Sequence, residues 1–493
     1  MKKNLTLLAV LCLATLGAKA QNGFRGAYFM DTYLYGHTMN PALTANRSYA
    51  SVALGHIDVQ TQSNLGASTF LYPTTGGSVT SFLDGGISSQ TFLSKIHKHN
   101  LENLNVQLDL INFGFWTQKN QFHSFSLNVR GVESAAAPYD IFRFLKDGST
   151  DGADYDLAGF GERTRLYAEA AYGISFPVAD KLRIGGKVKA LVGLAYEDMR
   201  FDRFDVTLSG ERWSVRTDGQ LLASNLPDQQ ATQTVKINEL LDTFDFGAYD
   251  WSQFRPGGFG AAVDLGATWD VLPWLQLSAS VTDLGFIHWK MDTRMTTGGS
   301  WEYTGFDKIS FEGNDNLQDQ LDAKMAELQK LIDFHRSDKG SPMDWLPATF
   351  YLGAKARALD WLSFGLLGTA RSEGKYSWAE LRGALNLEPC HWFGWSASAA
   401  YGSFGPKLTS LMNLRLGPFA LFVGAEMASP YFVSSDPRAK HSISNYINGD
   451  VYAIPRDNLN LNLMLGLNLV FGKTPAKRNH TGKYAEPVSV PLD

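Results

Sequence analysis

The sequence predicts an all-β protein, a transmembrane antiparallel β-barrel of about fourteen strands with an N-terminal plug and one helix in an outer loop. Three observations predict this fold. First, apolar and polar residues alternate in long runs. Second, the connections between these runs alternate between short and long. Third, aromatic residues gather beside the short connections. Alternation with a period of two puts one face of each strand against lipid and the other against the lumen.

The first twenty residues have the pattern of a secretory signal peptide. Lys2 and Lys3 precede an apolar core at 5–16, and Ala18-Lys19-Ala20 provides a cleavage site. We therefore expect residues 1–20 to be removed on export and the mature protein to reside in the outer membrane.

The cysteine count and the net charge bear on disulfide formation and on nucleic-acid binding. After cleavage Cys390 is the remaining cysteine, so no intrachain disulfide is expected. Loss of Lys2, Lys3 and Lys19 changes the formal net charge from −5 to −8, which gives no electrostatic case for binding nucleic acid.

Residues 21–47 show no sustained alternation and precede the first predicted strand. A barrel of this size encloses more space than its own side chains fill, so we interpret this apolar, aromatic segment as a plug in the lumen, with Pro41 fixing a turn. The alternative is a linker that lies across the barrel mouth.

The barrel is predicted to span residues 48–472. The clearest strand is NLNLNLMLGLNLVFGK (458–473), in which six leucines and Phe471 occupy every second position and asparagines share the other face. Closure requires this last strand to pair with the first, near residues 48–59, because an open edge in lipid leaves backbone amides unpaired. The predicted strands begin near residues 48, 105, 122, 163, 181, 257, 274, 346, 362, 377, 392, 410, 419 and 458.

The connections between these strands favour a barrel over a soluble sandwich. Connections of two to five residues alternate with longer ones such as 197–256 and 287–345, as short periplasmic turns alternate with outer loops in bacterial barrels. Tryptophans cluster beside the short turns, as in an interfacial aromatic girdle. They are Trp116, Trp269, Trp274, Trp361, Trp392 and Trp395.

Four charged residues are predicted to face the lumen. A symmetric hairpin at PVADK (177–181) would place Glu169 opposite Lys189, with Lys187 and Arg183 on the same face. A conducting pore would use such charges to select solutes, and a plugged barrel would use them to hold its plug.

Two stretches of the outer connections have patterns of their own. Residues 316–335 have a helical period, and their apolar face predicts either a ligand lid or an amphipathic helix packed on loop residues. That face consists of Leu317, Leu321, Met325, Leu328 and Ile332. The acidic stretch 147–156 could hold a hard cation, but it lacks the EF-hand spacing, so we interpret it as a solvated acidic loop.

Catalytic motifs are absent from the sequence. It contains no G-x-S-x-G, H-E-x-x-H, phosphate loop or C-x-x-C, so neither an enzyme nor a cofactor or metal is expected. A hydrolase assembled from distant strands remains the enzymatic alternative.

An ordered set of motifs resembles the uncharacterised outer-membrane barrels of Bacteroidota that form a domain family of unknown function. The motifs are HTMNPAL (37–43), VTDLGFIHW (281–289), WLPATFYLGAKA (345–356), LRLGPFALFVGAE (414–426) and GLNLVFG (466–472). The chain is more distantly similar to the long-chain fatty-acid transporter superfamily, a broad group that includes type IX secretion accessory barrels. That resemblance implies fourteen strands and a plug motif at Asn40, Pro41 and Ala42, which Leu43 follows here. Unlike barrels that end on an aromatic residue, this chain continues as a polar tail (473–493), which we expect to be disordered in the periplasm.

Two functions follow as hypotheses. The first is passive uptake of hydrophobic or amphipathic small molecules, with outer-membrane lipid and a small hydrophobic ligand as partners. The second is a non-transporting scaffold or secretion accessory barrel whose outer loops dock another surface protein. Uptake is preferred to the scaffold on the basis of the distant resemblance. A shared fold does not by itself define a function, since one fold hosts many functions.

Overall fold

The computed structural model describes most of the chain. The described residues are 24–52, 55–73, 79–148, 152–209, 212–225, 234–235, 255–303, 331–338, 340–428, 432–434, 451–455 and 458–472. The predicted signal peptide, the predicted tail 473–493, residues 149–151 of the acidic stretch and residues 304–330, which hold Leu317, Leu321, Met325 and Leu328, lie outside these ranges.

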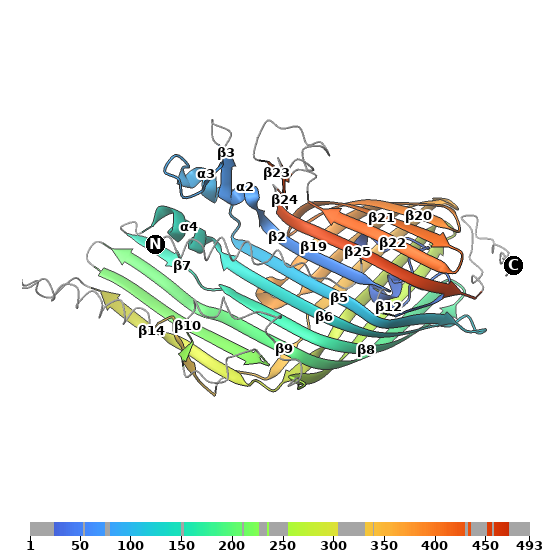
Figure 1. The fold of residues 1–493 in the computed structure, drawn as a ribbon, viewed down its shortest axis with the longest axis horizontal. Helices are drawn as coiled ribbons and strands as arrows, with labels where there is room; N and C mark the ends of the chain where they lie inside the picture. Colours follow the sequence, from blue (N-terminus) through green and yellow to red (C-terminus); the bar gives the residue numbers. More distant parts are fainter. Residues whose placement is uncertain are drawn as a thin grey trace, which may run out of the picture.

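The described residues form a closed antiparallel barrel with fourteen wall strands (Figure 1). The first wall strand is interrupted and consists of β1 (Ser48–Val52) and β2 (Ile57–Gly66). The others, in order around the barrel, are β5 (His99–Trp116), β6 (Phe122–Pro138), β8 (Gly161–Ala179), β9 (Leu182–Ser209), β12 (Gly258–Leu272), β13 (Leu275–Trp289), β17 (Ala348–Leu359), β18 (Leu362–Ser372), β19 (Trp378–Cys390), β20 (Phe393–Gly402), β21 (Gly405–Leu416), β22 (Phe419–Met427) and β25 (Asn458–Phe471). The predicted fold class is confirmed.

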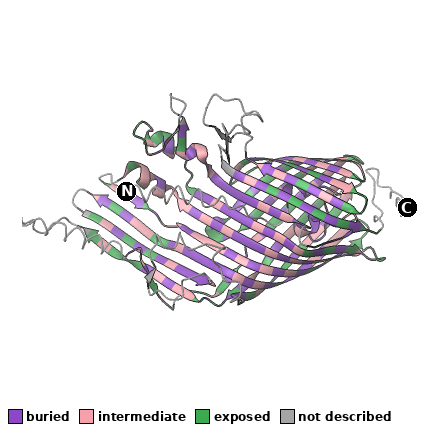
Figure 2. Ribbon diagram, in the orientation of Figure 1, coloured by how far each residue is buried: buried purple, intermediate pink, exposed green. Residues whose placement is uncertain are grey.

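Closure occurs between the last strand and the first. β25 pairs with β1, where Ser48 lies opposite Phe471, and with β2, where Ile57 lies opposite Leu465. Leu463 to Leu469 face outward with 43–49% of each leucine exposed, whereas Asn462 and Asn468 face inward and are buried. The alternating colours along the wall strands in view in Figure 2 show the same division.

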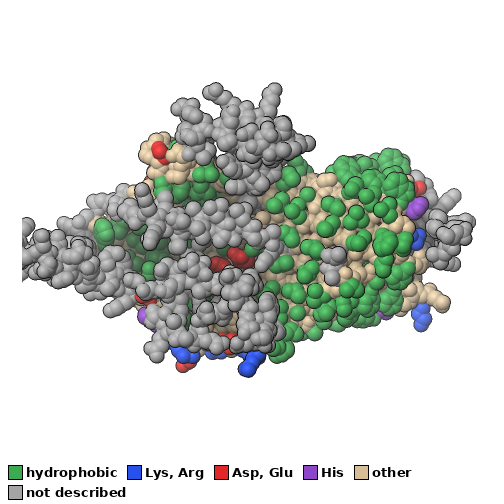
Figure 3. Space-filling model, viewed as in Figure 1, with side chains coloured by type: hydrophobic (Ala, Val, Ile, Leu, Met, Phe, Trp, Pro, Cys, Tyr) green, Lys and Arg blue, Asp and Glu red, His purple; other side chains and the backbone are tan. Residues whose placement is uncertain are grey.

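The outward face of the wall is apolar (Figure 3). Tryptophans near the short turns, Trp269, Trp274, Trp361 and Trp392, are each about half exposed at 45–50%. An apolar exterior around a closed ladder is the arrangement that lipid requires. No helix within the described ranges is long and apolar enough to cross a membrane.

The long connections contain more regular structure than the sequence predicted. β9 is 28 residues long and extends well past the barrel, where it pairs with β7 (Ala153–Asp156) and β10 (Arg212–Ser224), and β10 pairs with β14 (Thr293–Tyr303) (Figure 1). The sequence predicted no strands in the connections 197–256 and 287–345, and the strands found there correct that prediction. The remaining elements are α2 (Ala67–Phe70), β3 (Leu71–Pro73), β4 (Val79–Ser81), α3 (Ser89–Leu93), α4 (Tyr139–Asp147), β11 (Thr234–Val235), β15 (Phe334–Arg336), β16 (Met343–Trp345), η5 (Gly374–Tyr376), β23 (Phe432–Ser434) and β24 (Val451–Pro455).

We refer to the two ends of the barrel by their connections. The short-turn end holds the connections β5–β6, β8–β9, β12–β13, β17–β18, β19–β20 and β21–β22, together with the start of β1 and the end of β25. The long-loop end holds the other connections. The positions of groups inside the lumen are given below relative to these two ends.

Candidate functional site: the lumen and its outer vestibule

The N-terminal segment, residues 24–47, lies inside the barrel towards the short-turn end (Figure 1). It contains two 3-10 turns, η1 (Arg25–Ala27) and η2 (Gly36–Thr38), and most of its side chains are buried. Its aromatic residues pack with inward-facing wall residues in one cluster that includes Phe24, Tyr28, Phe29, Tyr33 and Tyr35 of the segment and Tyr49, Phe122, Tyr351, Leu411 and Phe422 of the wall. The segment fills this half of the lumen with apolar side chains.

Polar contacts fix the same segment to the wall. The Glu388 carboxylate accepts hydrogen bonds from the backbone N–H groups of Asp31 (3.1 Å) and Thr32 (2.6 Å). On β25, the Asn468 Oδ1 accepts a hydrogen bond from the Tyr35 hydroxyl at 2.6 Å. Charged acceptors form stronger hydrogen bonds than neutral ones, so Glu388 is a principal anchor.

The predicted plug motif Asn40-Pro41-Ala42-Leu43 forms a tight turn against the wall. Asn40 Oδ1 accepts from Ala42 N at 2.9 Å, and Asn40 Nδ2 donates to the Tyr28 hydroxyl at 3.1 Å. A side chain on the facing wall residue Gly266 would stand 2.0 Å from Asn40 Oδ1. The wall is therefore shaped to receive this turn, and glycine is needed for close approach.

Gly365 on β18 tests this fit between wall and segment. A Cβ atom there would lie 2.1 Å from Phe29 Cδ2, whereas one on Gly383 of β19 would meet no heavy atom within 4 Å. We expect Gly365→Ala to lower the free energy of unfolding by about 1–3 kcal/mol through overpacking, and Gly383→Ala to change it by much less. Denaturant unfolding in detergent micelles, followed by tryptophan fluorescence, measures both. Equal effects of the two substitutions would show that the segment does not pack tightly on the wall.

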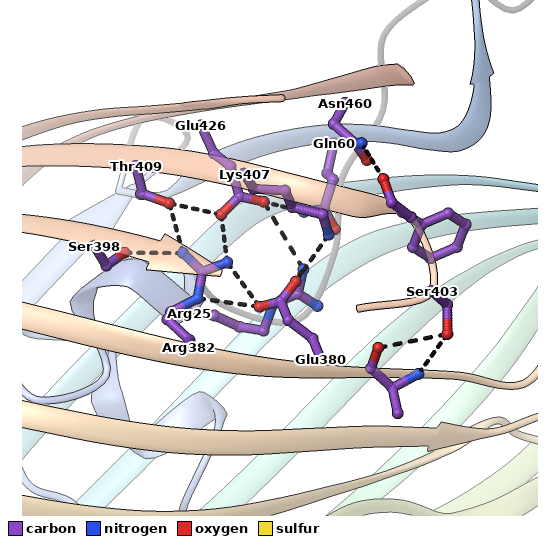
Figure 4. Close-up of polar contacts among 12 residues, drawn as sticks. Arg25, Gln60, Glu380, Arg382, Ser398, Ser403, Lys407, Thr409, Glu426 and Asn460 are labelled. Atoms are coloured by element: carbon purple, nitrogen blue, oxygen red, sulfur yellow. Dashed lines mark hydrogen bonds and ion pairs between the residues drawn. The ribbon is translucent and has the colours of Figure 1, made fainter. Parts of the chain in front are cut away.

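A first charge cluster joins the segment to β19, β21 and β22 (Figure 4). Arg25 of the segment contacts Glu380 at 3.3 Å. Arg382 donates to Glu380 (2.7 Å) and to Glu426 (2.6 Å), and Lys407 donates to Glu380 (2.8 Å). All five side chains are buried, and three cations surround two carboxylates.

A second cluster lies on the inward faces of β6, β8, β9, β12 and β13. Arg130 donates to both oxygens of Asp283 (3.0 and 3.2 Å) and to Glu169 (2.8 Å). Lys189 Nζ lies 2.6 Å from Asp283 and 2.9 Å from Asp264. Two cations and three carboxylates thus cross-link five neighbouring strands.

The four charged residues that were predicted to line up on the lumen face have different partners in the structure. The predicted register is wrong, because Phe176 pairs with Ile184 and not with Leu182. Glu169 consequently lies opposite Leu191, and its contact with Lys189, at 3.8 Å, is diagonal.

The other two predicted charges, Lys187 and Arg183, make their own contacts outside the second cluster, although Lys187 pairs across the strands with Asp264. Lys187 Nζ lies 3.5 Å from His37 Nδ1 of the N-terminal segment. Arg183 contacts Asn120 O at 2.9 Å and lies over the Trp116 ring. Ile332, from the predicted lid, lies in a turn before β15.

A third cluster lies nearer the long-loop end. Arg165 of β8 forms a bidentate pair with Asp344 of β16 (2.6 and 2.9 Å) and contacts Glu373, which follows β18. Burial raises the pKa of the Glu373 carboxyl, but Arg165 and Arg371 outweigh it and hold this pKa below the usual value. Glu373 is therefore ionised. Its ion pair with Arg165 joins β8 to the end of β18 across the lumen.

Above this third cluster the lumen opens into a vestibule of about 770 Å³. Asp344 and Glu373 line it together with charged and aromatic groups from β8, β9 and η5. These include Arg163, Asp198, Arg200, Tyr196, Phe201 and Tyr376. A cavity of this volume accommodates a drug-sized molecule, and its mixed lining suits one that has both polar and apolar parts.

The wall beside the vestibule is irregular. Asp283 has a φ of 62°, and β12 and β13 change register between Val263 and Leu265. On the other side of β13, regular pairing with β17 ends at Thr282–Thr349 and resumes with β16 at Phe286–Trp345. We call the interval formed by 283–285 and 346–348 the wall gap.

An apolar groove of about 440 Å³ lies at the wall gap. Its lining includes Val263, Leu284 and Phe286, which face outward, and Trp345, Leu346 and Ala348, which also line the vestibule. The vestibule and the lipid-facing groove therefore meet on one short segment of wall.

The sequence analysis did not identify most of the residues that form the three charge clusters and the vestibule. Arg25, Arg130, Arg165, Arg371, Glu373, Arg382 and Asp344 join residues far apart in the chain. Their signal in the sequence was a charged residue on the polar face of an alternating run, as at Glu380 and Arg382 in WAELRGALNL (378–387). No group of acidic, histidine or cysteine side chains that could hold a metal ion occurs among the described residues.

The chain belongs to a family of unknown function, DUF5723, whose model matches residues 41–426. Among curated proteins no relative matches it. Solved structures with a similar fold include the toluene transporter TbuX of Ralstonia pickettii, with a TM-score of 0.41 and 10% identity over 92% of this chain and 99% of that one. They also include a FadL homologue of Pseudomonas aeruginosa (0.41, 10%, 93% and 99%) and the toluene transporter TodX of P. putida (0.39, 10%, 89% and 94%).

Proposed function

We propose that this barrel mediates passive uptake of hydrophobic or amphipathic small molecules across the outer membrane. The observation that carries the proposal is that the vestibule and the lipid-facing groove share Trp345, Leu346 and Ala348. A molecule held in the vestibule needs to pass only this segment to reach the acyl chains of the membrane.

The N-terminal segment acts in this proposal as a plug. With the short-turn end facing the periplasm, as in bacterial barrels, its aromatic cluster blocks passage straight through the lumen. Anchoring by Arg25 and Glu388 keeps the plug in place. The sideways route through the wall gap is then the shorter one for an apolar molecule.

The wall gap suits a route of this kind. Between 283–285 and 346–348 the Leu346 N–H donates to Gly285 O at 2.9 Å, and the strand pairing of the regular ladder lapses over the rest of this interval. Pro347 has no N–H to donate to its neighbour, which limits the ladder at this place. The proposed activity involves binding and diffusion, with no covalent step.

Transfer of an amphiphile can be measured across bilayers whose outer leaflet is lipopolysaccharide, because that leaflet resists the entry of apolar solutes. We expect the protein to speed the entry of a fluorescent amphiphile several-fold over protein-free membranes and over membranes that hold an unrelated porin. Equal rates in all three preparations would refute transport.

A second candidate function is that of a scaffold. It is favoured by the sheet of β7, β9, β10 and β14, which extends beyond the barrel at the long-loop end (Figure 1). A surface protein that is retained in stoichiometric amount by gently extracted barrel, together with no acceleration of transfer, would select the scaffold.

A further inference from the structure

A small cavity lies at the short-turn end of the barrel, between the N-terminal segment and the wall. Its volume is about 20 Å³. From the wall it is lined by the β19–β20 turn and by the adjoining ends of β20, β21, β22 and β25, and from the segment by Thr32, Leu34, Asn46 and Arg47. This volume holds roughly one or two water-sized atoms, so it admits part of a small polar group.

Three basic side chains line this cavity, namely Arg47, His391 and Arg415. The Arg47 guanidinium donates to the Gly472 carbonyl oxygen at 3.1 Å, and the Arg415 guanidinium donates to that of Gly417 at 3.2 Å. Within the described part of the chain neither arginine forms an ion pair, and their two positive charges repel each other. Two like charges that face one cavity are stabilised when an anion lies between them.

Hydrogen-bonding groups accompany these charges. The Thr32 hydroxyl is enclosed and has no hydrogen-bond partner among the described residues, and the Asn413 side-chain amide donates to the Thr32 carbonyl oxygen. Glu388, which anchors Thr32, does not line the cavity, because its carboxylate accepts from the backbone N–H groups of Asp31 and Thr32. The cavity therefore combines two guanidinium groups with a hydroxyl that can donate, which favours an anionic ligand.

The cavity lies at the level of an aromatic belt. Trp392, which lines it, is 50% exposed, and Phe419 and Phe471, at the neighbouring ends of β22 and β25, are 48% and 50% exposed. Aromatic side chains gather where the membrane core meets the head groups. With the short-turn end facing the periplasm, as in bacterial barrels, this level is that of the phosphate groups of the inner leaflet.

We propose that this cavity binds a phosphate group. Paired N–H donors of a guanidinium match phosphate oxygens, and clustered arginines recognise phosphate in many proteins. One or two phosphate oxygens would lie between Arg47 and Arg415 and accept from the Thr32 hydroxyl. The group belongs either to a phospholipid of the inner leaflet or to a soluble phosphate compound in the periplasm. This site lies at the other end of the lumen from the vestibule and does not depend on the proposed uptake.

Two binding measurements on the full chain test the site. Calorimetric titration in non-ionic micelles at fixed ionic strength compares inorganic phosphate with acetate. Native mass spectrometry after release from nanodiscs compares retained phosphatidylglycerol with diacylglycerol, which has the same chains and no phosphate. We expect the phosphate-bearing member of at least one pair to bind tenfold or more tightly than its control. Arg47→Gln and Arg415→Gln should each weaken that binding by roughly ten- to hundredfold, since a hydrogen bond to a charged group is worth that much.

The matched control is Arg357→Gln, which should leave phosphate binding unchanged. Arg357 lies at the same end of the barrel but is 4.0 Å from Asp270 and does not line the cavity. Arg415→Lys keeps the positive charge and loses the paired donors, so it should bind phosphate with an affinity between those of the unaltered protein and Arg415→Gln.

Retention of phosphatidylglycerol alone would support the site with a lipid as the source of the phosphate, and binding of inorganic phosphate alone would support it with a soluble source. The proposal fails if neither phosphate binds more tightly than its control. It fails equally if binding survives replacement of both arginines, or if Arg357→Gln weakens binding as much as Arg415→Gln does. None of these results bears on amphiphile uptake, which the transfer measurement tests separately.

Discussion

Replacement of Arg382 by methionine should lower the free energy of unfolding by about 3–5 kcal/mol. The Arg382 side chain is 1% exposed and hydrogen-bonds to Glu380 and Glu426 and to the hydroxyls of Ser398 and Thr409 (Figure 4). Methionine fills a similar volume but removes the guanidinium that donates to both carboxylates, so that Glu426 has Arg25 at 3.9 Å in place of a cation at 2.6 Å. Removal of one partner from a buried ion pair is costly because the remaining charge loses its hydrogen-bonded partner in the interior.

The matched control is an exposed pair on the same chain. Arg203 Nε lies 2.7 Å from Asp205 on β9, but these side chains are 51% and 42% exposed, so Arg203→Met should change the unfolding free energy by less than about 1 kcal/mol. Urea unfolding of both variants in detergent micelles measures the difference. An effect of Arg382→Met no larger than that of the control would mean that the cluster contributes little to holding the barrel and its N-terminal segment.

The strands were predictable because each one faces two different media. Leucines at every second position from 459 to 469 have lipid on one side, and the asparagines between them have the lumen. Any shift by one residue would exchange the faces, so the pattern fixes the strand without knowledge of its neighbours. The closure of the last strand on the first followed for the same reason.

Register and the outer strands were not predictable in this way. Pro177 to Ala179 continue β8, so the β8–β9 turn is shorter than the predicted symmetric hairpin, and Ala179 pairs with Leu182. Turn geometry sets register, and alternation alone does not reveal where the turn begins. In the part of β9 beyond the barrel, the register shifts opposite Asp218 and Gly219, and the extra residue Asp202 moves the alternation by one position, so that it is not regular in the sequence.

The candidate site depended on contacts across the lumen. An inward charge could be recognised from its place on a polar face, but its partner could not. Arg25 meets Glu380 across 355 positions of sequence, and Arg165 meets Asp344 across 179. Such pairs are set by barrel closure and by the path of the N-terminal segment, neither of which is encoded in a local pattern.

The second large effect concerns the wall gap. Leu284 is 39% exposed, faces outward and lines the groove that meets the vestibule. A bulky apolar thiol reagent attached to Leu284→Cys should fill this groove and prevent passage from the vestibule to the bilayer. Leu463 of β25, which is 48% exposed on regular wall, provides the matched control position. Both variants require Cys390→Ser, so that the introduced cysteine is the one thiol in residues 21–493.

The most direct test of sideways uptake is therefore amphiphile transfer by these two proteins in lipopolysaccharide-faced bilayers, before and after modification. The account predicts that modified Leu284→Cys loses transfer, that cleavage of the attached group restores it, and that modified Leu463→Cys transfers at the unmodified rate. Undiminished transfer by fully modified Leu284→Cys would contradict the proposed route through the wall gap.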